Sequence, residues 1–174
     1  MKEIWDAYDE TENLLGIDLV RGEVIPSEMY HIGVSVLVRH VDGDYLLTKR
    51  CITKSTWPEY WEPSAGGYAL KGDTPEMAAI REVKEETGLI AKNPILVDKR
   101  THATMIHYYY IAETDCNKTA VKLLEGETID YMWVDTKGLI DMLDSGMVIP
   151  FQVECLAEYV QKLALAPPQQ KNRY

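Results

Sequence analysis

The order of apolar and polar residues along this chain indicates strands in most segments and helices in a few. β-Branched and aromatic runs bounded by turn residues predict strands at 3–8, 17–20, 30–40, 44–50, 60–67, 95–100, 104–112 and 128–134. Apolar residues at helical spacing predict helices at 75–87, 136–143 and 150–165. Strands that alternate unevenly with helices are typical of an α/β or α+β fold with a mixed sheet.

Turn and capping residues set the limits of two of these elements. Asp42 and Gly43 separate two apolar runs, which predicts a β-hairpin. Thr74 is suited to the N-cap of the first helix, Pro75 to its first position and Gly88 to its C-terminal stop. We therefore expect this helix to begin at Pro75 and to end just before Gly88.

The length of 174 residues, with 46% hydrophobic residues, is enough for one domain with its own core. No repeat or Gly/Ser-rich linker divides the chain, so we expect a single domain at 1–166, with an N-terminal extension at 1–29 and a disordered tail at 167–174. No apolar run has the length of a membrane helix, and the acidic opening MKEIWDAYDE lacks the apolar core of a secretory signal. These features predict a cytoplasmic protein with no membrane partner.

Acidic residues outnumber basic ones by 28 to 18, which gives a formal net charge of −10. A negative field of this size argues against nucleic acid and against an anionic membrane as partners. It leaves room for a small phosphorylated ligand if cations line the site. The three cysteines share no metal-ligand spacing and are expected to be free thiols.

One face of the predicted helix at 75–87 gathers three carboxylates. Glu82, Glu85 and Glu86 lie at positions i, i+3 and i+4, beside the small residues Ala78 and Ala79. The residues expected to form the core face lie on the other side: Met77, Ile80 and Val83.

Like charges at this spacing repel each other, and the last turn of a helix disfavours anions. A divalent cation such as Mg²⁺ or Mn²⁺ would reverse both effects, because these ions prefer oxygen ligands. The alternative is a solvated acidic face without a ligand. The helix by itself leaves both interpretations open.

The sequence around this helix resembles the signature of the Nudix hydrolase family. Gly67 is followed after five residues by Asp73 and after seven more by REVKEETGL at 81–89. Only Asp73 departs from the signature, which has Glu there. Trp61 before the two glycines and the later stretch ETIDYMWVD also resemble the family.

The resemblance implies a Nudix-type α/β/α sandwich with a mixed sheet. It implies that Glu82, Glu85 and Glu86 bind Mg²⁺, with Mn²⁺ as a substitute. Arg81 would orient a carboxylate of the signature by ion pairing, and Gly67 would let the preceding loop fold over the helix. Because Asp73 is one methylene shorter than Glu, it is expected to support the loop rather than to touch the metal.

Members of the family usually add an acidic residue from outside the signature, as a ligand or a general base. Glu127 is the favoured candidate, with Glu125 and Asp130 as alternatives. Because Glu127 and Asp130 are an odd number of residues apart, a strand would point them to opposite faces.

The activity implied by the resemblance is hydrolysis of a phosphoanhydride bond in a nucleotide, or in a nucleoside diphosphate linked to another moiety. The residues implied to take part are Glu82, Glu85, Glu86, Arg81 and Glu127. One alternative is a non-catalytic module that senses a nucleotide. Another is the isopentenyl-diphosphate isomerase branch of the same superfamily, which the N-terminal part resembles through His31 and TWPEYW at 56–61. That isomerase needs a cysteine and a histidine where this chain has SAGGY.

Several residues around the signature are candidates for binding a small phosphorylated substrate. They are Arg50, Lys54, Trp61, Gly66 and Gly67. Cations suit phosphate, and an aromatic ring suits a base, although solvation or core packing would explain the same residues. His31 is expected to be structural. Dimers are common in the family, so a homodimer is a further expectation by analogy.

Overall fold

The computed structural model describes residues 2–165, and the tail expected at 167–174 lies outside them. The strands are β1 (Ile4–Tyr8), β2 (Leu14–Val20), β3 (His31–His40), β4 (Tyr45–Arg50), β5 (Trp61–Pro63), β6 (Ala65–Tyr68), β7 (Lys92–His102), β8 (Met105–Thr114) and β9 (Thr128–Val134). The helices are α1 (Pro75–Thr87), the 3₁₀ turn η1 (Lys118–Ala120), α2 (Thr136–Asp144) and α3 (Pro150–Leu165). No helix in this part of the chain is long and apolar enough to cross a membrane.

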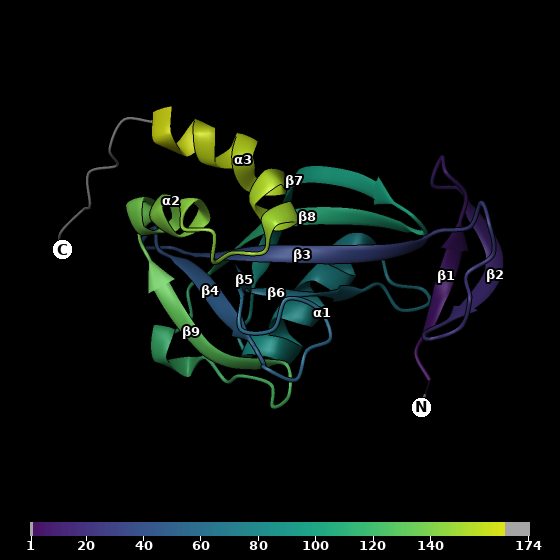
Figure 1. Ribbon diagram of the computed structural model, residues 1–174, viewed down its shortest axis with the longest axis horizontal. Coiled ribbons are helices and arrows are strands. Elements are labelled where there is room, and N and C mark those ends of the chain that lie inside the picture. Colours follow the sequence, from purple (N-terminus) through teal and green to yellow (C-terminus); the bar gives the residue numbers. More distant parts are fainter. Residues whose placement is uncertain (1, 166–174) are drawn as a thin grey trace.

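The larger sheet is mixed, as the sequence predicts. Its strand order is β5–β4–β3–β8–β7, with β6 also paired to β3 and β9 to β4. Strands β3 and β8 run parallel, and the other pairs are antiparallel. The short strands β1 and β2 form a separate hairpin at one end of the molecule (Figure 1).

Helices cover both faces of the larger sheet and give an α/β/α arrangement. Helix α1 packs on one face through Ala78, Ala79 and Val83, which are fully buried. Helices α2 and α3 lie on the opposite face, where Leu139 and Leu156 contribute to a second apolar cluster (Figure 1). The core is therefore divided into two layers by the sheet.

The sheet opens into two branches at the predicted Asp42–Gly43 hairpin. The turn forms, with Gly43 at a φ of 101°, but β3 pairs with β4 only near Arg39 and Tyr45. Between Gly33 and Val36, β3 pairs with β6 instead. The buried Ser64 hydroxyl joins the branches, since it accepts a hydrogen bond from the Val38 amide and donates one to the Leu46 carbonyl, both at 2.8 Å.

Two expectations about the elements differ from the structure. The segment at 60–67 forms two strands rather than one, because β5 stays with β4 while β6 joins β3. The core face of α1 is also rotated from the predicted one, since Met77 is 54% exposed whereas Glu82 is buried. The helix turns Ala78, Ala79 and Glu82 toward the sheet, because the small residues permit a close approach there.

His31 anchors the N-terminal hairpin to the sheet. Its ring stacks on Trp5 of β1 with the ring centroids 4.2 Å apart, and Tyr68 packs against both rings. Burial lowers the pKa of His31 to about 4, so the ring is neutral at pH 7. The role is structural, as expected from the sequence.

We predict that His31→Phe makes the protein less sensitive to acid. The unfolded chain binds a proton at His31 below a pKa of about 6.5, whereas the folded protein resists it until about pH 4. The free energy of unfolding therefore decreases as the pH is lowered from about 6.5 to about 4. Without the imidazole, this decrease should be smaller by about 1–2 kcal/mol. Urea unfolding at pH 7, 5.5 and 4.5 measures this, and identical pH slopes for both proteins would contradict the assignment.

Candidate active site

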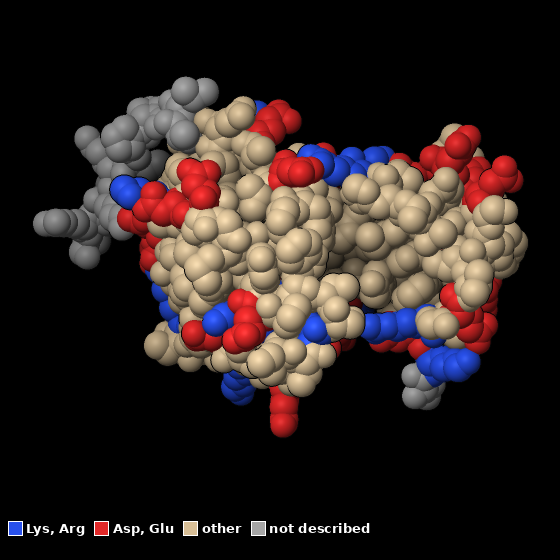
Figure 2. All heavy atoms as spheres, viewed as in Figure 1, with Lys and Arg blue, Asp and Glu red and all other residues tan. Residues whose placement is uncertain are grey.

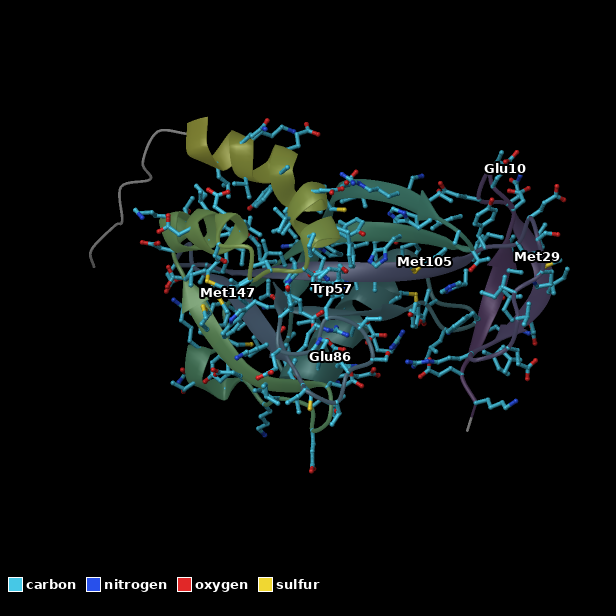
Figure 3. All side chains as sticks on the ribbon, viewed as in Figure 1. Glu10, Met29, Trp57, Glu86, Met105 and Met147 are labelled. Atoms are coloured by element: carbon cyan, nitrogen blue, oxygen red, sulfur yellow. The ribbon has the colours of Figure 1, made fainter. Side chains whose placement is uncertain are left out.

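A pocket with a volume of about 550 Å³ lies where the branches of the sheet separate. Its walls come from the ends of strands β3 to β6, from α1, from β8, and from the start of α3. Glu3 and Arg21 of the N-terminal hairpin close one side. Figure 3 shows Trp57 and Glu86 near the middle of the molecule and Met105 between them and the hairpin, all three of which line this pocket.

The acidic face of α1 reaches the pocket because β6 carries glycine at the contact. A Cβ on Gly67 would lie 2.3 Å from the Glu82 carboxyl carbon, so any other residue at this position would displace the Glu82 carboxylate. Gly66 lies close to β3, with a Cβ position 3.1 Å from the Val34 carbonyl oxygen. Glycine at position 67 therefore lets the Glu82 carboxylate lie directly against β6.

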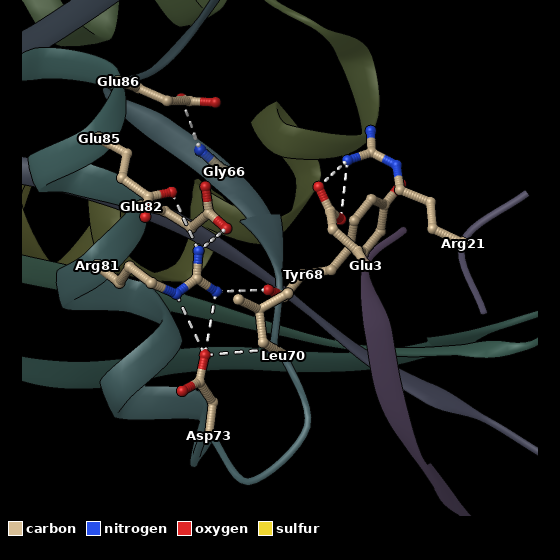
Figure 4. A network of polar contacts seen from close by, with 10 residues as sticks. All are labelled: Glu3, Arg21, Gly66, Tyr68, Leu70, Asp73, Arg81, Glu82, Glu85 and Glu86. Carbon is tan, nitrogen blue, oxygen red and sulfur yellow. Dashed lines mark hydrogen bonds and ion pairs between the residues drawn. The ribbon is translucent and has the colours of Figure 1, made fainter. Parts of the chain in front are cut away.

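Arg81 holds the loop and two carboxylates of the signature together (Figure 4). Its Nε and Nη2 donate to one carboxylate oxygen of Asp73 at 3.2 and 3.1 Å, and Nη2 also donates to the Tyr68 carbonyl. Its Nη1 donates to Glu82 at 2.8 Å and to Glu85 at 3.2 Å. Asp73 is thus occupied by Arg81 and supports the loop, while Glu82 and Glu85 face the pocket.

Glu86 lines the pocket without an ion pair of its own among the described residues. Its carboxylate accepts one hydrogen bond, from the Gly66 amide at 3.2 Å. Burial is the main cause that raises its pKa to about 8, and the nearby charges of Glu62 and Glu82 add to it. A cation that entered the pocket would therefore stabilise the ionised form of this carboxyl group.

Two cations lie opposite these acids, and each is paired with a carboxylate. Arg50 donates to the buried Glu62 at 2.8 Å, and Lys54 forms an ion pair with Glu127. Burial raises the pKa of Glu62 and lowers that of Lys54. The Glu127 carbonyl accepts a hydrogen bond from the Cys51 amide at 2.8 Å, which fixes this residue at the pocket wall.

The structure brings most of the predicted site residues together. The pocket is lined by Arg50, Lys54, Gly66, Gly67, Arg81, Glu82, Glu85, Glu86 and Glu127. The two alternatives to Glu127, namely Glu125 and Asp130, are exposed and do not line it.

Trp61 is not at the pocket. It is 7% exposed and packs in the apolar cluster under α2 and α3. Successive side chains of a strand point to opposite faces, so the neighbouring Glu62 faces the pocket instead. Trp57, which is 39% exposed, supplies an indole ring at the pocket wall.

Sequence reasoning missed several polar lining residues, among them Ser35, Glu62, His107 and Gln152. A signal existed for Glu62, because a charged residue directly after Trp61 in a buried strand needs a partner. Nothing in the sequence connects Ser35 of β3, His107 of β8 and Gln152 of α3, which are distant along the chain.

The side chains at the pocket are of the type that binds a divalent cation, but they are not gathered closely enough to form a complete set of ligands. Within residues 2–165, no three acidic, histidine or cysteine side chains form a metal-binding cluster. Glu82, Glu85 and Glu86 nevertheless offer carboxylate oxygens to one pocket, and oxygen is the donor that Mg²⁺ and Mn²⁺ prefer. An ion held by all three would compete with Arg81 for Glu82 and Glu85.

Comparison with known proteins agrees with this architecture. The chain is 32% identical over 157 residues to an uncharacterized Nudix hydrolase of Listeria monocytogenes, covering 86% of this chain and 89% of the relative. It is 27% identical over 127 residues to an isopentenyl-diphosphate Delta-isomerase of Escherichia coli, covering 67% of this chain and 68% of that enzyme.

A crystal structure from Deinococcus radiodurans superposes with a TM-score of 0.67 at 20% identity, covering 92% of this chain and 98% of that one. This similarity shows a shared fold. Residues 29–151, which include the glycine loop, α1 and β9, match the NUDIX domain. The chain therefore belongs to the Nudix family.

Proposed function

We propose that this protein is a Mg²⁺-dependent hydrolase that cleaves a phosphoanhydride bond in a nucleotide, or in a nucleoside diphosphate linked to another moiety. Mn²⁺ is expected to substitute for Mg²⁺. The observation that carries the proposal is the partly buried Glu86 carboxyl group, which lines the pocket with Glu82 and Glu85 and has a raised pKa. A cation bound there would stabilise its ionised form.

The residues of the chain have distinct tasks in this reaction. Glu82, Glu85 and Glu86 hold the metal, which when bound offsets the charge of the diphosphate oxygens and makes water a better nucleophile. Arg81 positions two of these carboxylates through its ion pairs. Arg50 and Lys54 supply positive charge to the wall that the diphosphate faces.

Glu127 is the group we assign as general base. Water attacks phosphorus, its proton passes to the carboxylate, and the bridging P–O bond breaks to give two phosphate products. The ion pair with Lys54 holds the Glu127 carboxylate at the pocket wall.

The isomerase alternative is supported only by similarity to relatives with that name. The loop at 64–68 carries neither cysteine nor histidine, and Tyr68 packs against His31 instead. A non-catalytic sensor remains the alternative that experiment has to separate from a hydrolase.

The first prediction is metal-dependent turnover. A set of nucleotides and nucleoside diphosphate conjugates should be cleaved with Mg²⁺ or Mn²⁺ and not with EDTA. In ¹⁸O-labelled water, mass spectrometry should find the label in a phosphate of the product. Tight binding of one compound without any turnover would favour the sensor instead.

The second prediction concerns Glu86→Gln. Loss of one metal-binding carboxylate should lower kcat by at least about 100-fold. Because the variant removes a partly buried charge that lies near other acids, the metal-free protein at pH 8 should be at least as stable to heat as the wild type. The control is Glu76→Gln, on the same helix but bonded to Tyr110 away from the pocket, and it should keep full turnover. A Glu86→Gln protein with wild-type kcat would contradict the metal assignment.

The third prediction uses two glutamates that are two residues apart. Glu127→Gln should reduce kcat about 100-fold, because a general base contributes on this scale, with little change in KM. Glu125→Gln, at an exposed position, should leave kcat unchanged. Steady-state kinetics on the best substrate of the screen measures both, and equal effects of the two changes would remove Glu127 from its proposed role.

A further inference from the structure

The pocket has a second part, beyond the carboxylates, that the proposed hydrolysis does not use. We call it the inner compartment, and it is formed by Ser35, Met105, His107, Phe151 and Gln152. In the view of Figure 2 the surface is hollowed between the sheet and the N-terminal hairpin, and uncharged side chains form most of the wall around the hollow. None of these five side chains carries a formal charge at neutral pH.

Gln152 is the strongest indication that a ligand binds there. Its side chain is 5% exposed, and within the described part of the chain its Oε1 has no hydrogen-bond partner. The amide interacts with the Glu62 carboxylate, and a carboxylate can only accept, so the NH₂ group faces Glu62 and Oε1 is left over. A buried acceptor without a donor costs free energy, which a ligand N–H or O–H group would recover.

His107 is uncharged and also incompletely bonded. Its Nε2 lies 2.9 Å from the Ser35 hydroxyl, while its Nδ1 has no hydrogen-bond partner among the described residues. Burial lowers the pKa of His107 to about 4. The compartment therefore offers a neutral polar edge rather than a charge, which excludes it as a second phosphate site.

The other walls are apolar and suit a flat ring. The Phe151 ring meets the His107 ring edge to face, with the centroids 6.5 Å apart, and Met105 contributes a thioether beside them. Thioethers and aromatic rings pack well against other rings.

The compartment adjoins the carboxylates through Gly66. The Gly66 amide donates to Glu86 at 3.2 Å, and a Cβ on Gly66 would lie 3.3 Å from the Ser35 hydroxyl oxygen. The site for the phosphates and the inner compartment thus share one wall. A single ligand can occupy both.

We propose that the inner compartment binds an amino-bearing nucleobase, whose exocyclic N–H donates to Gln152 Oε1 while the attached diphosphate lies at the α1 carboxylates. This assignment rests on the proposed function for the position of the diphosphate. It makes Gln152 the residue that selects the base.

The test compares two probes that differ only in the donor: ADP, and purine riboside 5′-diphosphate, which lacks the amino group of adenine. Titration calorimetry with Ca²⁺ in place of Mg²⁺ measures binding while hydrolysis is held down. Wild type should bind ADP about tenfold more tightly, the scale of one buried hydrogen bond. Gln152→Leu should bring the ratio of the two Kd values close to one. The control Gln161→Leu, at an exposed position of the same helix, should keep the wild-type ratio.

Each result separates this proposal from the hydrolase assignment. Equal affinities in the wild type, an unchanged ratio in Gln152→Leu, or no binding of either probe would overturn the base site, even if the protein hydrolyses other diphosphates. A ratio that depends on Gln152 would support the base site, even if no compound is turned over. A merely structural role of Gln152 would weaken both probes together and leave the ratio as it was.

Discussion

The close approach of α1 to β6 is the constraint on which the rest of the site depends. Only glycine at position 67 lets the Glu82 carboxylate lie against the strand, and the small residues Ala78 and Ala79 let the helix settle on the sheet. This approach turns Glu82 inward, while Glu85 at the pocket rim keeps 53% of its side chain exposed. Arg81 then fixes the loop and two carboxylates in one network.

Opening of the sheet creates the space that the acidic helix faces. Strand β3 leaves β4 after a short contact and pairs with β6, and Ser64 supplies hydrogen bonds between the two branches. A continuous sheet would have filled this position with side chains from both strands. Backbone pairing therefore determines where the pocket lies. Its charge comes from side chains of several elements that line it.

Several features of the site could be predicted from the sequence because they are local. The limits of α1 follow from its capping residues, and the spacing of Glu82, Glu85 and Glu86 follows from helical geometry. The family resemblance supplied the interpretation of these residues. The position of Trp61 could not be predicted in the same way, because one register step in β5 decides whether it or Glu62 faces the pocket.

The sequence by itself determined most of the elements, the α/β character, the family and the acidic helix, since these are encoded in neighbouring residues. The tertiary structure alone decided which face of α1 is buried. It also decided that Glu127, rather than Glu125 or Asp130, lines the pocket. The meeting of Ser35, His107 and Gln152 at one pocket is a third outcome of this kind. These are long-range relations between β3, β8 and α3. They depend on strand pairing and helix packing across the whole chain, and no local pattern of residues records them.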